Sequence, residues 1–207
     1  MISGVICFGD SILAGTGASF RDKGCAKLLK ARLKIPVSLK GINRNTSQDG
    51  LIRLQQDVLD QKNLSHVIIL FGNNDCRFVD SNRFSVSQDH FIENLKEMAA
   101  SIKRNHQIPM FCNLQPIDFP MLFQFMPEVQ KIYSENKINP EELQGTYSDL
   151  IENFAKKSAE ILIDIRTPLK CKKNEILAKD GLHPNDYGHE IIAQKIFAEL
   201  KKYDSTI

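Results

Sequence analysis

Short runs of apolar, largely β-branched residues alternate with longer stretches of helical periodicity along this chain of 207 residues. The apolar runs predict strands at residues 2–8, 35–39, 66–71, 108–114 and 160–165. The helical pattern predicts helices near residues 22–33, 49–61, 87–104, 140–158 and 186–202. Apolar strands that alternate with helices are typical of a parallel sheet covered by helices on both faces. We therefore expect an α/β fold.

Local signals support the helix positions. Asn139 followed by Pro140, Glu141 and Glu142 combines an N-cap residue, a proline at the first helical position and two acids at the positive end of a helix. We see neither a repeat nor a low-complexity linker, and the length suits one full-sized core. We therefore predict a single domain over residues 1–207.

The longest irregular stretch is predicted at about residues 115–138, where three prolines interrupt the pattern. A loop this long in a compact domain is often functional. Leu122, Phe125, Met126 and Val129 within it also fit one face of a short helix. Two interpretations stay open here: a helix that packs on the core, or an apolar wall that faces a substrate.

Composition narrows the class of protein. Hydrophobic residues make up 42% of the chain and charged residues 25%, and the net charge of +2 is too small to predict nucleic-acid binding. No apolar run reaches the ~18 residues of a membrane span. The first predicted strand begins at Ile2 and leads directly into a glycine motif, so we expect a cytoplasmic protein.

The five cysteines are not arranged as a zinc site or a disulfide framework, because they form no close pair. Cys7 and Cys112 fall within apolar strands, so we expect them to be small core residues. Nothing in the sequence requires a metal or another cofactor.

The stretch CFGDSILAGTG, residues 7–17, follows the first apolar run and raises three interpretations. A phosphate-binding loop is excluded, because it lacks the lysine of a Walker motif and the third glycine of a dinucleotide motif, and Asp10 would repel phosphate. An ordinary turn remains open. The third interpretation is that the turn presents Ser11 for reaction.

Two further motifs favour a reactive serine. In DGLHPN, residues 180–185, Asp180 precedes His183 by three positions, so its carboxylate can orient the imidazole as in a hydrolytic triad. In GNND, residues 72–75, Asn74 follows the third predicted strand and its amide can donate to an oxyanion. Carboxyl ends of strands are the usual ligand-binding edge of such sheets. The other histidines are interpreted as structural or surface residues: His66, His90, His106 and His189.

Together these motifs resemble the three blocks of the SGNH hydrolases, also called GDSL-type esterases and lipases: Gly9-Asp10-Ser11-Ile12, Gly72-Asn73-Asn74-Asp75 and Asp180-Gly181-Leu182-His183. The blocks come in the family's order and span nearly the whole chain. The resemblance implies a flavodoxin-like three-layer α/β/α sandwich with a five-stranded parallel sheet. It also implies a serine acyl-ester hydrolase that forms a covalent acyl-enzyme and acts on a small-molecule acyl ester without a cofactor.

The resemblance assigns roles to individual residues. Ser11 would be the nucleophile, His183 the base and Asp180 its orienting acid, and Asp10 would be structural. The oxyanion hole would be formed by the Ser11 backbone N–H, the Asn74 side chain and a backbone N–H that the family often takes from a glycine. Here that position is Arg44, whose N–H serves only if the backbone φ there suits a residue other than glycine.

Three alternatives stay open on the same fold. The protein could be a carbohydrate O-acetylesterase, an acyltransferase, or a catalytically inactive binding protein, and the arginine at position 44 is the best support for the last of these. The Arg44 side chain would either lie in solvent or bring a cation to the mouth of the pocket.

Overall fold

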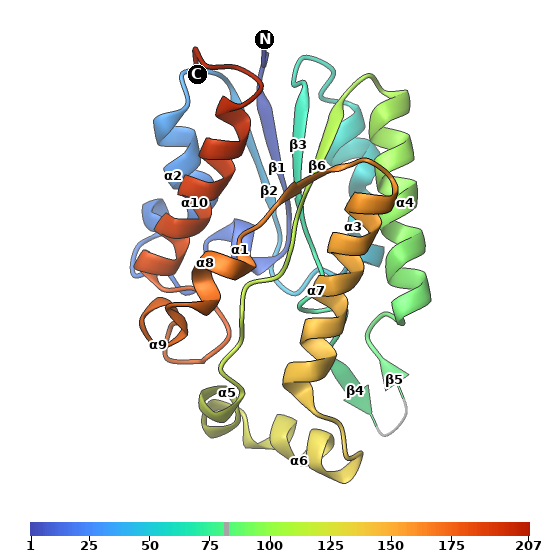
Figure 1. The fold of residues 1–207 in the computed structure, drawn as a ribbon, viewed down its shortest axis with the longest axis vertical. Helices are drawn as coiled ribbons and strands as arrows, with labels where there is room; N and C mark the ends of the chain where they lie inside the picture. The colour runs from blue at the N-terminus through green and yellow to red at the C-terminus, as the bar shows by residue number, and fades with distance from the viewer. Residues whose placement is uncertain (81–82) are drawn as a thin grey trace.

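The computed structural model describes residues 1–80 and 83–207 and has three layers, with a parallel sheet between two layers of helices (Figure 1). The sheet consists of β1 (Val5–Gly9), β2 (Val37–Gly41), β3 (His66–Leu70), β6 (Ile108–Cys112) and β7 (Ile161–Ile163). All neighbouring strands are parallel and their order is β2-β1-β3-β6-β7. This is the flavodoxin-like order, so the predicted α/β/α sandwich is confirmed.

Alternation within each strand explains the two helical layers. In β1, Val5 and Cys7 belong to the core on one face of the sheet, and Ile6 and Phe8 belong to the core on the other. The first face is covered by α2 (Cys25–Arg32), α8 (Arg166–Lys170), α9 (Lys173–Ile176) and α10 (Asp186–Lys201). The second face is covered by α3 (Ser47–Leu54), α4 (Gln88–Arg104) and α7 (Pro140–Lys157).

The predicted elements are present, with shifted ends. The strand expected at 160–165 is only three residues long, and the helix expected at 49–61 is α3 followed by a π-helical turn at Gln55–Leu59. Several short elements were not predicted. They are α1 (Ser11–Ala14), the hairpin of β4 (Phe78–Asp80) and β5 (Arg83–Phe84), α8 and α9. The helix predicted near 22–33 is a 3₁₀ turn, Arg21–Lys23, followed by α2. The stretch 115–138, for which a short helix is one of the two interpretations above, contains α5 (Phe119–Phe125) and α6 (Pro127–Glu135).

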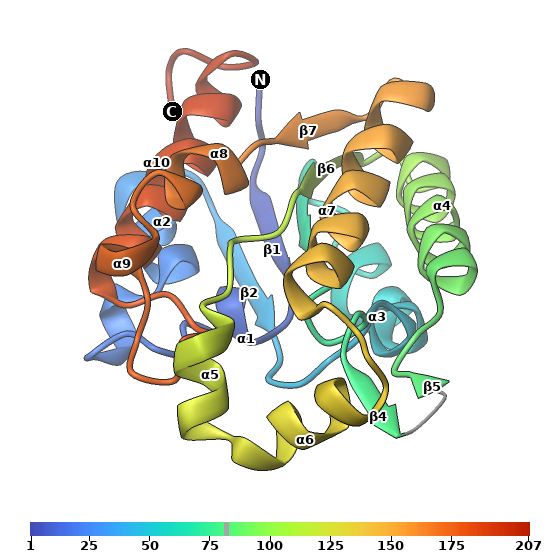
Figure 2. The same ribbon diagram turned by 60° about the horizontal axis from the view of Figure 1, so that its bottom comes forward.

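The two helices α5 and α6 and the β4–β5 hairpin lie together at the end of the molecule toward which β1 and β3 run (Figures 1 and 2). The Asp118 side chain caps α5 by accepting from the Met121 backbone N–H at 2.9 Å. Ile117, Phe119 and Leu122 form a small hydrophobic cluster of their own, separate from the two main cores. This end of the sheet therefore carries an added apolar structure beyond the carboxyl ends of its strands.

Candidate active site

Ser11 lies where β1 ends and α1 begins. The Asp10 carboxylate caps α1 by accepting from the Ile12 backbone N–H at 2.9 Å, and Gly15, with a φ of 87°, ends the helix after one turn. This short turn leaves Ser11, at 8% exposure, on the wall of a cavity. Asp10 itself is fully buried, and its second oxygen, Oδ2, has no hydrogen-bond partner among the described residues. Burial raises the pKa of Asp10 to about 7.

Ser11, His183 and Asp180 form a continuous hydrogen-bonded chain. The distance from His183 Nε2 to Ser11 Oγ is 3.0 Å, and that from His183 Nδ1 to Asp180 Oδ2 is 2.5 Å. The other Asp180 oxygen accepts from the backbone N–H groups of Leu182 and His183, both at 3.0 Å. The structure thus places these three residues together, with the carboxylate on the imidazole nitrogen that faces away from Ser11.

The surroundings of Asp180 favour its ionised form. Burial alone would raise its pKa, but the hydrogen bonds from the His183 side chain and from the backbone of His183 and Leu182 lower it below the usual value. A carboxylate in this state can orient the imidazole and stabilise its protonated form.

Two of the residues that line the cavity have backbone N–H groups without partners in the described part of the chain. Those of Ser11 and Arg44 make no hydrogen bond with the residues that the structure describes, and both residues line the cavity. Arg44 has a φ of 65°, in the left-handed region that favours glycine, and its side chain is exposed. The arginine therefore has a backbone conformation that glycine adopts more readily.

Asn74 completes this set of donors. It follows β3, lines the cavity, and donates one N–H of its amide to the Asn45 carbonyl oxygen at 3.0 Å. That bond fixes the amide orientation and leaves the second N–H available. Ser11, Arg44 and Asn74 therefore all line the same cavity.

A buried carboxylate anchors the turn that carries Asn74. Asp75 Oδ1 accepts from the Ser47 backbone N–H at 2.8 Å and from the Ser47 hydroxyl at 2.5 Å, and Asn94 donates to that hydroxyl at 2.8 Å. Burial raises the pKa of Asp75 to about 6. These bonds join the turn after β3 to the first residue of α3, so the Asn74 turn and the Arg44 loop are held to one another.

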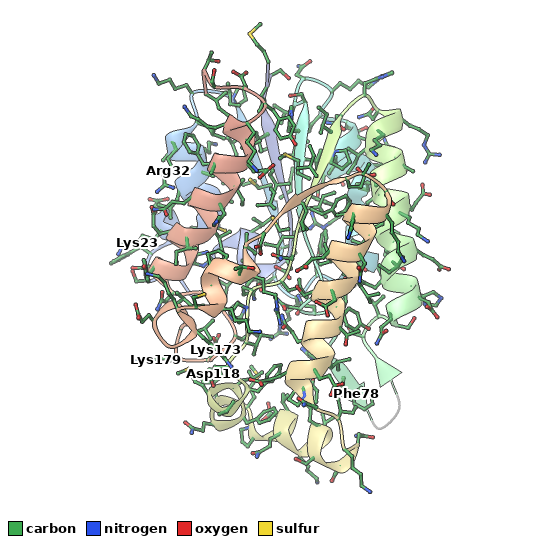
Figure 3. All side chains as sticks on the ribbon, viewed as in Figure 1. Lys23, Arg32, Phe78, Asp118, Lys173 and Lys179 are labelled. Carbon is green, nitrogen blue, oxygen red and sulfur yellow. The ribbon has the colours of Figure 1, made fainter. Side chains whose placement is uncertain are left out.

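The cavity has a volume of about 590 Å³ and is lined by polar and apolar residues. Its polar lining includes Thr16, Asn43, Arg77, Glu128 and the residues described above. Its apolar side comes mainly from α5, α6 and the residues around them: Phe78, Ile117, Phe119, Leu122, Met126, Val129, Ile132, Tyr133 and Leu182. Figure 3 labels Asp118 and Phe78 at this end of the molecule.

The stretch 115–138 therefore combines the two interpretations made from the sequence. It forms two helices with a small cluster of their own, and it also lines the cavity through Leu122, Met126 and Val129. Phe125 differs from the other three residues of the predicted face, because it is 58% exposed and does not line the cavity.

His189 and the core cysteines have structural surroundings. His189 is fully buried, with Nε2 3.0 Å from the Thr16 carbonyl oxygen and Nδ1 accepting from the Cys25 backbone N–H at 3.2 Å. Burial lowers its pKa, so the imidazole is held neutral. Cys7 and Cys112 are buried in the core, as predicted.

Three residues at or beside this site were not predicted from the sequence. Phe78 and Tyr133 line the apolar side of the cavity, but no local signal linked them to the motifs. Arg53 bonds to the loop that carries Arg44, and only its polar character beside Leu51, Ile52 and Leu54 sets it apart in the sequence.

Comparison with known proteins identifies the family. The model of the GDSL-like lipase/acylhydrolase family matches residues 7–191. This chain belongs to that family. The match includes all three sequence motifs, and the sequence-based assignment to the GDSL-type hydrolases is confirmed.

Solved structures share this fold at low sequence identity, and one curated protein is similar in sequence. A lipase/acylhydrolase from Enterococcus faecalis has a TM-score of 0.77 at 24% identity, covering 98% of this chain and 97% of its own. An acetylxylan esterase from Geobacillus stearothermophilus has a TM-score of 0.74 at 20% identity, covering 96% and 94%. An uncharacterized lipoprotein, YqeF, from Bacillus subtilis is 28% identical over 170 residues, 77% of this chain and 69% of its own length.

Proposed function

We propose that this GDSL-family hydrolase is a serine acyl-ester hydrolase whose catalytic residues are Ser11, His183 and Asp180. The observation that carries the proposal is the hydrogen-bonded chain of 3.0 Å and 2.5 Å that links them on the wall of a cavity. His183 takes the proton from the Ser11 hydroxyl as its oxygen attacks the acyl carbonyl. His183 then protonates the leaving alkoxide, and water releases the acyl group from Ser11 by the same route.

The oxyanion of each tetrahedral intermediate is bound by three donors: the backbone N–H groups of Ser11 and Arg44 and the free N–H of the Asn74 amide. Donors that are already in place at such a position commonly contribute a factor of about 10² to 10³ each to turnover. The left-handed backbone of Arg44 weakens the case for an inactive binding protein, because the departure from glycine leaves the N–H in place.

The apolar side of the cavity supports an acyl group longer than acetate. Its volume of about 590 Å³ lies within the range of small-molecule sites, roughly 300–1,000 Å³. A second candidate, a carbohydrate O-acetylesterase, is favoured by the acetylxylan esterases among the structural neighbours. An acyl chain would contact the wall formed by α5 and α6, whereas an acetyl group would leave most of that wall to the alcohol.

The test is hydrolysis of p-nitrophenyl esters from acetate to palmitate by wild-type protein and by Ser11→Ala. We expect turnover on esters longer than acetate and a loss on the order of 10⁶ in the variant, with nearly unchanged thermal stability. Ser158→Ala, at an exposed position after α7, is the matched control and should keep full activity. More than a tenth of wild-type turnover in Ser11→Ala would remove Ser11 from the mechanism, and a preference for acetate would favour the O-acetylesterase.

No helix within residues 1–80 and 83–207 is long and apolar enough to cross a membrane. A cytoplasmic location stays a prediction, and the word lipoprotein in the name of the Bacillus subtilis relative does not support it.

A further inference from the structure

One arginine joins the strand that presents Ser11 to the loop that presents Arg44. Arg53, on α3, donates from Nη2 to the Gly9 carbonyl oxygen at 2.8 Å and from Nε to the Asn45 side-chain oxygen at 2.7 Å. Gly9 ends β1 two residues before Ser11, and Asn45 directly follows Arg44. A single guanidinium therefore bonds to the chain close to Ser11 and Arg44, which both line the cavity and whose backbone N–H groups have no partner among the described residues.

The same contacts reach the third oxyanion donor. The carbonyl of Asn45, whose side chain Arg53 binds, is the group that accepts from the Asn74 amide at 3.0 Å. Arg53 also donates from Nη1 to the Lys40 carbonyl oxygen in β2 at 3.0 Å. It thereby ties the ends of two strands and the start of the Arg44 loop to one rigid group.

The position of the guanidinium is itself closely determined. Its carbon lies 4.3 Å from the centre of the Phe8 ring and 5.7 Å from that of Phe71, both of which are buried. Nη1 also forms an ion pair with Asp57 at 2.7 Å, one helical turn along the chain. The Arg53 side chain is only 13% exposed. Stacking, an ion pair and a planar fork of donors hold it in one orientation, which a lysine would not reproduce.

We propose that Arg53 is a positioning residue of the oxyanion hole. Its guanidinium fixes Asn45 and the Gly9 carbonyl, and through them it sets the relative positions of the Arg44 N–H, the Ser11 N–H and the Asn74 amide. The inference rests on the proposed function, since it concerns the hole of that reaction. No contact between Arg53 and the substrate is proposed.

The first test replaces the guanidinium and compares kcat with KM. Arg53→Met keeps an apolar stem beside Phe8 but removes every donor. We expect kcat to fall about 10- to 100-fold while KM changes less than about threefold, because misplaced donors stabilise the transition state less but bind the substrate about equally well. Arg53→Lys should recover only part of that loss. The control is Arg32→Met, which removes an ion pair with Glu190 between α2 and α10 and should retain wild-type kcat.

A double-mutant cycle separates positioning from general loss of structure. If Arg53 acts through the hole, Arg53→Met should cost much less kcat in an Asn74→Ala background than in wild type, because the donor that it helps to place is already gone. A purely structural role would give the same fold-loss in both backgrounds. Each kcat is calculated per folded molecule, and the folded fraction of each variant is measured by near-ultraviolet circular dichroism.

Asn45→Ala covers the case in which Arg53→Met fails to fold. It removes the oxygen that accepts from Arg53 Nε but keeps the backbone carbonyl that accepts from Asn74, and we expect the same selective loss of kcat. Additive effects in the cycle, or kcat within about threefold of wild type in folded Arg53→Met or in Asn45→Ala, would overturn the inference. Substantial turnover in Ser11→Ala would instead overturn the proposed function, so the two failures are distinguishable.

Discussion

Asp10→Asn should stabilise the protein above neutral pH and much less in acid. In the folded protein burial raises the Asp10 pKa from 3.8 to about 7. The folded state therefore keeps its proton between these values while the unfolded state releases it, so this carboxyl's contribution to the free energy of unfolding is greatest in acid. It falls as the pH rises toward 7 and then levels off. The whole shift corresponds to roughly 4 kcal/mol at 1.36 kcal/mol per pKa unit, of which about 3 kcal/mol is lost between pH 5 and pH 8.

The assay is urea unfolding of wild type and Asp10→Asn at pH 5, 6.5 and 8. Asparagine keeps the oxygen that caps α1 and does not titrate, so the difference between the two proteins isolates this carboxyl. We expect the free energy of unfolding of the variant, relative to that of wild type, to increase by about 3 kcal/mol from pH 5 to pH 8. Asp22→Asn, at a side chain that is 90% exposed, is the control and should show no such trend. A difference that is constant with pH, or that grows toward acid, would refute the reasoning.

Two further predictions concern the site. Asp180→Asn should lower kcat by about 10² to 10⁴, because it permits the wrong imidazole tautomer; unchanged kcat would mean that another acid orients His183. Arg44→Gly and Arg44→Ala should both keep kcat within a few-fold of wild type. Arg44→Gly should also raise the free energy of unfolding by up to about 1 kcal/mol, because glycine adopts the positive φ of this position without the steric cost that arginine has. If the guanidinium binds an anionic group of the substrate, both variants should raise KM about tenfold for anionic esters only, and equal KM changes for neutral esters would exclude that role.

The layers of the fold could be predicted because each strand carries its own signal. Alternating apolar residues in β1 serve two cores, and the helices between strands leave a parallel sheet as the simple arrangement. The order of the motifs then places Ser11 and Asn74 at one edge, since the carboxyl ends of parallel strands lie together. The contact between Asp180 and His183 could be predicted for a local reason, because three residues separate them.

The apolar wall could not be predicted in the same way. The prolines in residues 115–138 interrupt any long helical pattern, and the choice between a core face and a cavity wall depends on what lies opposite. Leu122 packs in a small cluster and also lines the cavity, whereas Phe125, on the same predicted face, is exposed. Hydrophobicity alone does not distinguish these environments, because they are set by tertiary contacts.

The contacts of Arg53 could not be predicted, because most of its partners carry no sequence signal. Two of its acceptors are the backbone carbonyls of Gly9 and Lys40, which every residue possesses. Asp57 at the i,i+4 position would have suggested an ordinary surface ion pair, worth only about 0.3–0.5 kcal/mol on an exposed helix. The stacking on Phe8 and the bond to Asn45 arise only when β1, β2 and α3 are assembled.

The left-handed backbone of Arg44 is related to the hydrogen bond that Arg53 makes with the next residue. Arg44, whose N–H we propose as an oxyanion donor, has a left-handed backbone, which costs a non-glycine residue roughly 1–2 kcal/mol. In this chain the next residue, Asn45, is bound on both its side chain and its carbonyl, and the Thr16 hydroxyl donates to the Asn43 side chain at 2.9 Å on the other side. The neighbours of Arg44 are thus fixed by contacts outside the loop, and these contacts offset the backbone cost. The N–H that we propose as an oxyanion donor can therefore keep its place although residue 44 is not a glycine.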